Sequence, residues 1–426
     1  MRGRLVFGNT VRLLFSRLYS SISFKPSLVL YASDDCSLCT HFKRHLNTFL
    51  QKNAQLKLHI EIRDIKQCNE EIFEKFKHEI PVLVADESTV VCKHRFTPNK
   101  SMLAVHGGVS FQVPENTAKW CADALSPSTE DIVTAVSHLE DHKWFNCGRG
   151  SNLTSQQTVE CEAGFMTSKY FRFGGVGCVS RLKNPIQVAE ALAMDPGISG
   201  LIRPQVLVGK GAEEWAAERE FSLCDPEELI TKNARKEWTE TYEFIQAANS
   251  QEDLVQAMEK LDTVGGVAIL DHHAEACVSS GGIRFKRPGR LGHCTQMGSG
   301  VWADKTPDSL IAVSASGCGE ALVWTDFCRS LAMTVVNRSP DELPAQVVEE
   351  WFRKNFVNST YLHDFPAQFR LAGGIIMLQE SGCSELLVFH NTPYFPIAFR
   401  SRNSRVKALV STMKPGQPMK VDSFLL

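Results

Sequence analysis

The 426-residue sequence has almost no net charge and no long apolar run. Its formal net charge of -2 gives no electrostatic reason to expect a nucleic acid or an anionic membrane as partner. No apolar segment reaches the ~18–20 residues that cross a bilayer, so we expect a soluble protein without membrane contact. A hydrophobic share of 43% and a charged share of 22% are typical of globular chains, and this length allows two or three domains.

The sequence also lacks a secretory signal and a second closely spaced cysteine pair. Fourteen cysteines are scattered along the chain, which favours free thiols over a disulfide framework. A zinc site would need that second pair at suitable spacing. We therefore expect no metal and no cofactor.

No acidic residue precedes Asp34. Residues 1–26 instead combine several serines with arginines such as Arg12 and Arg17, and VRLLFSRLYSSISF can form an amphipathic helix. This composition is typical of a mitochondrial transit peptide, although a disordered N-terminus would also be basic and rich in serine.

Residues 27–100 alternate between strand and helix patterns and predict a small α/β domain. SLVLY, LHIEIRDI, IPVLVAD and STVVCKH have strand patterns, while THFKRHLNTFL and NEEIFEKF have helical spacing. From residue 101 to 426, strands such as SMLAVHGG, DSLIAVSASG, GGIIMLQE and SELLVFHNT occur in blocks with the helical ALVWTDFCRSLAMTVV and PAQVVEEWFRKNF. Such blocks fit a layered αββα arrangement as well as an open sheet.

A polar helical region, Asp225 to Lys260, ends abruptly at the strand pattern DTVGGVAIL. Thr263 is the first residue of that strand and follows Asp262. A threonine hydroxyl is a weak nucleophile unless a base lies beside it, and an N-terminal threonine carries its own base in the free α-amine. Catalysis by Thr263 would therefore require cleavage of the chain between Asp262 and Thr263.

The sequence around Thr263 resembles the type 2 asparaginase family and, within it, the threonine aspartases called taspases. The resemblance covers about 320 residues and rests on collinear motifs: LEDHKWFNCGRGSNL, ECEAGFM, FGGVGCVSRLKNPIQVA, LDTVGG, VSSGGIRFKRPGRLGHC and VSASGCGE. It implies an N-terminal-nucleophile hydrolase with an αββα sandwich, matured into an α segment ending at residue 262 and a β segment starting at 263. It also implies a homodimer of such αβ units.

The resemblance assigns roles to particular residues. Thr263 is the nucleophile, both in self-cleavage and against substrate, and Ser280 is the second hydroxyl that hydrogen-bonds it. Arg290 holds a substrate carboxylate, which suits a planar donor with two prongs. Ser316 and Gly317 stabilise the oxyanion, a contribution of about 3–4 kcal/mol per donor, and Gly319 keeps the substrate-binding turn open.

Position 293 favours a peptidase over an amidase. Asparaginases of this family hold the substrate ammonium with an aspartate three residues after the arginine, where this chain has His293. An unpaired buried ammonium is costly, so we expect an endopeptidase that cuts polypeptides after Asp, with transcription regulators implied as substrates by the resemblance. The alternatives are an isoaspartyl peptidase/L-asparaginase and a scaffold that never matures.

Other positions depart from the taspase pattern. The family's Asp-Ala pair reads Glu162-Ala163, the first glycine loop reads HGGVSF, and the first helical hairpin is shorter. A lysine that taspases carry after this loop has only Lys119 as its nearest counterpart. These departures weaken the resemblance to taspases and leave open slow or absent maturation.

Residues 27–100 resemble a compact glutaredoxin-like family with a thioredoxin-like fold. Cys36 and Cys39 form a CxxC pair at the start of a predicted helix, where the helix end stabilises a thiolate. Pro81 occupies the place of the cis-proline that faces such a pair. The resemblance makes Cys36 the attacking thiol and Cys39 the resolving thiol, while an inert thioredoxin fold remains the alternative.

The junction of the two domains is short. The glutaredoxin-like family ends in a helix, whereas here FTPNKSML leads directly into the hydrolase's first strand. Either the small domain is truncated in a true fusion, or two reading frames have been joined. The N-terminus indicates mitochondria, and the hydrolase resemblance indicates the cytoplasm or nucleus.

Overall fold

The computed structural model describes residues 28–33, 39, 60–77, 82–85, 89–93, 102–111, 114–126, 128–247, 263–270, 272–380, 383–401 and 404–426. The chain divides into two compact units, which are treated separately below. Within these ranges, no helix is both long and apolar enough to cross a membrane.

The small unit is a four-stranded sheet with strand order β2-β1-β3-β4. Its strands are β1 (Leu28–Ala32), β2 (Ile60–Asp64), β3 (Val82–Ala85) and β4 (Thr89–Lys93), and α3 (Glu70–Phe76) follows a short η2 (Ile65–Gln67). β1 runs parallel to β2 and antiparallel to β3. Asn69 caps α3, because its side chain accepts a hydrogen bond from the Ile72 N–H. The predicted strands and the second predicted helix are confirmed, while the helix predicted for THFKRHLNTFL lies outside the described residues.

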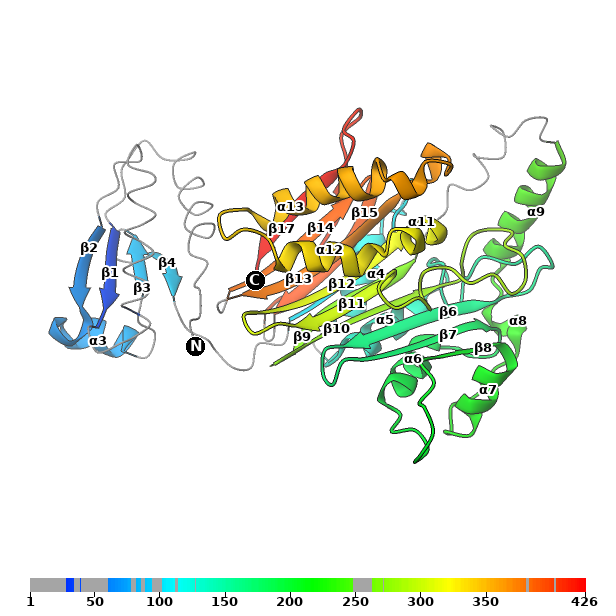
Figure 1. Ribbon diagram of the computed structural model, residues 1–426, viewed down its shortest axis with the longest axis horizontal. Coiled ribbons are helices and arrows are strands. Elements are labelled where there is room, and N and C mark those ends of the chain that lie inside the picture. Colours follow the sequence, from blue (N-terminus) through cyan, green and yellow to red (C-terminus); the bar gives the residue numbers. More distant parts are fainter. Residues whose placement is uncertain are drawn as a thin grey trace. The chain divides into compact units, whose positions relative to one another are not determined.

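The large unit contains two sheets, visible in the centre of Figure 1. The eight-stranded sheet has the order β16-β15-β5-β9-β10-β6-β7-β8, and the five-stranded sheet has the order β11-β12-β13-β14-β17. The strands are β5 (Met102–His106), β6 (Cys161–Thr167), β7 (Arg172–Val179), β8 (Val206–Val208), β9 (Val264–Leu270), β10 (His273–Ser280), β11 (Val301–Lys305), β12 (Ser309–Gly317), β13 (Ala372–Glu380), β14 (Cys383–His390), β15 (Tyr394–Ser401), β16 (Lys407–Thr412) and β17 (Lys420–Leu425).

Helices cover the outer face of each sheet, which gives the αββα sandwich implied by the resemblance (Figure 1). α12 and α13 pack on the five-stranded sheet, while α4, α5 and α6 pack on the eight-stranded sheet. The helices are α4 (Thr117–Ala124), α5 (Ile132–Glu140), α6 (Pro185–Met194), α7 (Gly209–Ala217), α8 (Pro226–Leu229), α9 (Lys232–Ala247), α11 (Gly319–Trp324), α12 (Phe327–Val336) and α13 (Pro344–Trp351), followed by the π-helix η3 (Phe352–Val357) and the short η4 (Thr360–Leu362) and η5 (Ala367–Phe369).

Strand β9 is buried on both faces. One face lies against the five-stranded sheet and the other against α5. Val267 and Ile269 join the core that lies between the sheets, whereas Val264 and Ala268 join the core beneath the helices. Its two glycines are required by close packing: a Cβ on Gly265 would lie 2.2 Å from Ser314 Oγ, and one on Gly266 would lie 2.6 Å from Ile132 Cδ1. The sheets and α5 therefore fix the position of the strand that begins beside Thr263.

Three predicted helices are interrupted. ALVWTDFCRSLAMTVV forms α11 and α12 rather than one helix, because Asp326 has the left-handed φ of 44° between them. The polar helix after Asp225 is broken between α8 and α9 by Ile230, which has extended backbone. The helix of PAQVVEEWFRKNF changes to π-helical spacing at Phe352.

Candidate active site

Three neighbouring strands place a threonine, a serine and a glutamate in one row. Val264 pairs with Ser279, so one further step of the same register sets Thr263 opposite Ser280. Ser280 in turn pairs with Glu162 on β6. Directly opposed residues of neighbouring strands project to the same face of the sheet, so the three side chains lie side by side at the end of the sheet.

The hydroxyl groups of Thr263 and Ser280 are in contact. Thr263 Oγ1 donates a hydrogen bond of 3.1 Å to Ser280 Oγ, which also accepts one of 2.9 Å from the Gly282 N–H. Both residues are buried. The predicted pairing of Ser280 with the nucleophile therefore corresponds to an actual contact.

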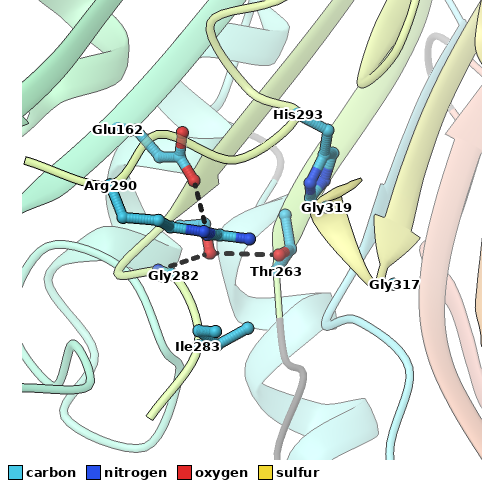
Figure 2. A pocket seen from close by; sticks show the side chains of 9 residues that line it. Glu162, Thr263, Gly282, Ile283, Arg290, His293, Gly317 and Gly319 are labelled. Atoms are coloured by element: carbon cyan, nitrogen blue, oxygen red, sulfur yellow. Dashed lines mark hydrogen bonds and ion pairs between the residues drawn. The ribbon is translucent and has the colours of Figure 1, made fainter. Parts of the chain in front are cut away.

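A pocket opens beside these hydroxyls (Figure 2). The side chains of Glu162, Arg290, His293 and Thr263 are directed toward it, and its full lining is Glu162, Thr263, Ser280, Gly282, Ile283, Arg290, His293, Gly317 and Gly319. Its open volume of about 10 Å³ is roughly the room for one water molecule. An aspartyl group needs more space, so the pocket must widen before a substrate can enter.

Arg290 is held by two carboxylates. Its Nε donates to Glu320 Oε1 at 2.9 Å and its Nη2 donates to Glu320 Oε2 at 2.6 Å, while Nη1 lies 3.7 Å from Glu162 Oε1. Burial opposes ionisation of Glu320, but the hydrogen bonds from Arg290 outweigh it and lower the pKa of that carboxyl. The guanidinium is thus fixed with one edge toward the pocket, and Glu320 is a site residue for which the sequence argument gave no role.

Glu162 lies almost entirely within the protein, with 1% of its side chain exposed. Its Oε2 accepts a hydrogen bond of 2.8 Å from the Gly292 N–H, and Oε1 has no hydrogen-bond partner in the described part of the chain. Burial raises the pKa of this carboxyl, against the opposing charges of Lys286 and Arg290. In the sequence analysis Glu162 stood out only because it replaces the aspartate of the family's Asp-Ala pair. In the structure it lines the pocket.

Hydrogen bonds from neighbouring segments hold the loop from Gly281 to Gly292 in place. Asn146 and Asn152 each donate a side-chain hydrogen bond of 2.8 Å to Gly282 O. Lys286 Nζ donates to Glu160 O at 2.7 Å, although the side chain of this lysine is buried. These hydrogen bonds hold the loop between Ser280 and Arg290. Both asparagines belong to FNCGRGSNL, a motif that the sequence alone tied to no contact.

Gly317 and Gly319 both line the pocket, and neither position has room for a side chain. A Cβ on Gly317 would lie 2.2 Å from Leu371 O, and one on Gly319 would lie 2.8 Å from Arg290 Nη2. The hydroxyl of Ser316 accepts a hydrogen bond of 3.1 Å from the Val109 N–H, and Ser316 is not among the lining residues. Of the predicted oxyanion pair, the structure brings Gly317 to Thr263 and directs the Ser316 side chain to the loop after β5.

Two buried histidines stay neutral near the site. Burial and then the charge of Arg290 lower the pKa of His293 to about 4, and its Nε2 lies 3.2 Å from Ala315 O, to which it donates in the Nε2–H tautomer. Burial lowers the pKa of His106 to about 3, and its Nε2 lies 2.9 Å from Ser314 Oγ. His106 thereby links β5 to β12 beneath the start of β9, a contact between the two sheets that no sequence motif had indicated.

Several predicted site residues lie outside the described residues: Asp262, Cys36 and Pro81. Cys39 is described, has helical backbone and is fully buried. The roles of Cys36 as attacking thiol and Cys39 as resolving thiol stay predictions. In the large unit, the buried free thiols include Cys121, Cys161, Cys277, Cys294 and Cys328.

Comparison with known proteins shows two family matches. Residues 116–383 match the type 2 asparaginase family, and residues 27–100 match a glutaredoxin-like domain. The isoaspartyl peptidase of Escherichia coli is 32% identical over 260 residues, which cover 55% of this chain and 74% of that protein. The isoaspartyl peptidase/L-asparaginase of Xenopus laevis is 30% identical over 258 residues (57% and 79%), and that of Rattus norvegicus is 32% identical over 303 residues (66% and 81%).

These matches fit the geometry. The matched region contains β9, β10 and the loop that carries Arg290, so it includes the hydroxyl pair and the pocket. The sandwich is that of an N-terminal-nucleophile hydrolase, preceded by a small glutaredoxin-like domain. The chain is a hydrolase that belongs to the type 2 asparaginase family.

Proposed function

We propose that this protein is a threonine-nucleophile hydrolase of β-aspartyl amide bonds, an isoaspartyl peptidase/L-asparaginase, activated by cleavage before Thr263. The observation that carries the proposal is the hydrogen bond of 3.1 Å between Thr263 Oγ1 and Ser280 Oγ, in a pocket that also contains Arg290. Relatives named isoaspartyl peptidase and isoaspartyl peptidase/L-asparaginase support the substrate class.

Activation generates the catalytic base. In the intact chain the nitrogen of Thr263 belongs to a peptide bond and cannot accept a proton. Attack of Thr263 Oγ1 on the carbonyl carbon of residue 262 breaks the C–N bond and forms an ester, and water then hydrolyses the ester to a carboxylate and a free α-amine. That amine has an ordinary pKa of about 7.7–8.0, so it can accept the hydroxyl proton near neutral pH.

Turnover then repeats the same chemistry on substrate. Thr263 Oγ1 attacks the side-chain carbonyl of an asparagine or isoaspartyl residue, and its proton passes to the α-amine and on to the leaving amine. Arg290 orients the substrate by binding its α-carboxylate or the equivalent main-chain carbonyl. Water hydrolyses the acyl-threonine ester, releases the β-carboxylate and restores the hydroxyl.

The second candidate is an endopeptidase that cuts after Asp, as in the taspases. It is favoured by the neutral His293, which offers no negative charge to a substrate ammonium. In this alternative Arg290 would bind the side-chain carboxylate of the P1 aspartate.

The experiment is intact-mass analysis and N-terminal sequencing of the full-length protein beside Thr263→Ala, followed by a substrate panel. We expect two fragments in the wild type, the smaller beginning Thr-Val-Gly-Gly, and one uncut chain in the variant. Hydrolysis of an isoaspartyl dipeptide or of asparagine supports the first candidate, and cleavage of internal Asp-containing peptides alone supports the second. An uncut wild-type chain without activity would contradict both candidates and favour the alternative of a scaffold that never matures.

For the small domain we propose thiol-disulfide exchange, with Cys36 attacking and Cys39 resolving. Family similarity over residues 27–100 and the burial of Cys39 support it. We expect the wild type to reduce a glutathionylated peptide and Cys36→Ser to lose this activity. Equal rates in the two proteins would favour the alternative of an inert thioredoxin fold.

A further inference from the structure

A second cavity is formed by the loop after α5 and the start of α9. Its volume is about 400 Å³, whereas the pocket beside Thr263 has about 10 Å³, and the two share no lining residue. Lys143, Trp144 and Arg149 line it from the loop, and Ile230 and Lys232 line it from the other side. Cavities of about 300–1,000 Å³ are of the size that binds small organic molecules. This cavity therefore has room for a ligand that the proposed hydrolase function does not use.

Among the described residues, only cations bring charge to this cavity. Lys143 and Arg149 come from the loop, and Lys232 is the first residue of α9. All three are exposed, and within the described ranges none of them forms a salt bridge. Like charges that line one cavity repel each other, and the cavity concentrates their field. Because the whole chain has a formal net charge of -2, this positive charge is a local feature, and it indicates an anionic ligand.

An aromatic wall accompanies the cations. Trp144 lines the cavity and is 39% exposed. Its indole lies parallel to that of Trp120, with an interplanar angle of 2° and 6.1 Å between the ring centroids, and Lys143 Nζ lies 5.6 Å from the Trp144 centroid. A partly exposed indole whose orientation is already set by a neighbour offers a flat surface on which a planar ring can stack.

Hydrogen bonds hold the backbone on both sides of the cavity. The Gly150 N–H donates to Leu229 O at 3.2 Å, which joins the loop to the segment before α9. At the start of α9, Thr231 Oγ1 accepts a hydrogen bond of 3.0 Å from the Ala234 N–H. The cavity is thus formed before any ligand arrives, so binding does not require the backbone to rearrange.

We propose that this cavity binds a small ligand that joins a phosphate group to a planar ring, which is the chemistry of a nucleoside monophosphate. A phosphate monoester carries a charge of about −1.5 to −2 at pH 7, which suits three cations better than the single charge of a carboxylate. Arg149 can donate two parallel hydrogen bonds to the phosphate. The ring stacks on Trp144, as nucleobases do on exposed aromatic side chains. This site is separate from the catalytic pocket and does not depend on the proposed hydrolase function.

The test measures binding of adenosine monophosphate, inorganic phosphate and adenosine to the full-length protein by calorimetry. We expect the wild type to bind adenosine monophosphate about 10- to 100-fold more tightly than phosphate, the contribution of one stacked base. Adenosine should bind at least about 10-fold more weakly than its monophosphate, because it leaves the cations unpaired. Trp144→Leu should remove the preference for the nucleotide over phosphate and keep the binding of phosphate.

Lys232→Gln and Lys236→Gln are a matched pair on α9. Lys232 lines the cavity, whereas Lys236 lies one turn further along, outside the cavity lining, and forms an ion pair with Glu240. We expect Lys232→Gln to weaken both adenosine monophosphate and phosphate about 10-fold, the loss of one hydrogen bond to a charged group. Lys236→Gln should leave both affinities unchanged. Arg149→Gln changes an exposed side chain on the other side of the cavity and should act like Lys232→Gln.

Three results would overturn the proposal. The first is a wild type that binds no adenosine monophosphate at millimolar concentration, or binds it no more tightly than phosphate. The second is wild-type affinity in both Lys232→Gln and Arg149→Gln. The third is loss of nucleotide binding in Arg290→Gln, since that would assign the ligand to the pocket beside Thr263. Thermal unfolding midpoints equal to that of the wild type show that each variant is folded.

Discussion

Arg290 and Glu320 form a two-pronged ion pair, with hydrogen bonds of 2.9 and 2.6 Å between the guanidinium and the carboxylate. The arginine side chain is 14% exposed and the glutamate side chain 43%. The pair joins the loop after β10 to the first turn of α11, so it sets the distance between the two elements that border the pocket. A planar guanidinium can hold Glu320 with one edge and face the pocket with another, which a lysine cannot do.

The first prediction concerns Arg290→Lys. We expect KM for an isoaspartyl dipeptide to rise about 10- to 100-fold with a smaller change in kcat, because the variant loses substrate positioning and keeps the nucleophile. Steady-state kinetics of the matured enzyme check this. Arg329→Lys, an exposed change at the ion pair with Asp326, is the control and should leave both constants unchanged. A loss in kcat alone for Arg290→Lys would contradict the substrate-binding role.

The second prediction concerns Ser280→Ala. This change removes the acceptor for both Thr263 Oγ1 and the Gly282 N–H, so we expect kcat to fall about 10- to 100-fold, the equivalent of one hydrogen bond of ~1.5–3 kcal/mol. Ser280→Thr keeps the hydroxyl and should retain most activity. Single-turnover assays would show the effect, and full activity of Ser280→Ala would remove this hydroxyl from the mechanism.

The third prediction uses two glycines. Gly317→Ala places a Cβ 2.2 Å from Leu371 O at a φ of +151°, so we expect a loss of at least ~2 kcal/mol in the free energy of unfolding. Gly211→Ala meets nothing within 4 Å inside α7, so it should be neutral or stabilise by ~0.5–1 kcal/mol. Thermal unfolding of both variants decides the matter; an unchanged midpoint for Gly317→Ala would show that the turn can relax.

The fourth prediction concerns pH. Burial raises the pKa of Glu140 to about 8, although its carboxyl accepts hydrogen bonds from Ser279 Oγ at 2.6 Å and the Ile186 N–H at 3.1 Å. The folded protein thus favours the protonated form. This contribution to stability is complete below the ordinary pKa near 4.5 and is lost as the pH rises through about 8.

The full difference is on the order of 5 kcal/mol. We expect the unfolding midpoint of Glu140→Gln to exceed that of the wild type increasingly between pH 5 and 8, because the amide stays neutral. Parallel melts across this range check the sign. A constant gap between the two proteins at every pH would show that Glu140 is not protonated in the folded state.

The hypothesis that Thr263 is the nucleophile starts from a local signal. A helical pattern that ends at LDT, directly before the alternating residues of VGGVAIL, predicts a break in the chain at the start of a buried strand. The collinear motifs added Ser280 and Arg290, and the αββα fold is confirmed. Helix interruptions such as that at Asp326 were missed because a left-handed residue is fixed by its tertiary neighbours rather than by helix propensity.

Position 293 gave the sequence its argument about the substrate. The missing aspartate leaves a substrate ammonium without a counter-charge, which favours an endopeptidase, whereas the relatives fit the stated alternative, an isoaspartyl peptidase/L-asparaginase, better. The fold brings the buried Glu162 into the same pocket from a strand more than a hundred residues earlier in the chain. Such a neighbour is set by strand register, which the residues around position 293 do not specify.

The sequence by itself determined the order of the candidate residues along the chain: a threonine directly before the strand VGGVAIL, then the serine and the arginine of VSSGGIRFKRPGR, then the glycines of VSASGCGE. Only the tertiary structure decided which carboxylates surround that arginine, that the Ser316 hydroxyl contacts the Val109 N–H, that Gly317 has no room for a side chain, and that one oxygen of Glu162 is buried without a donor among the described residues. The physical reason is that hydrogen bonding and desolvation depend on groups brought together by strand register, and register is set by the packing of both sheets rather than by neighbours in sequence.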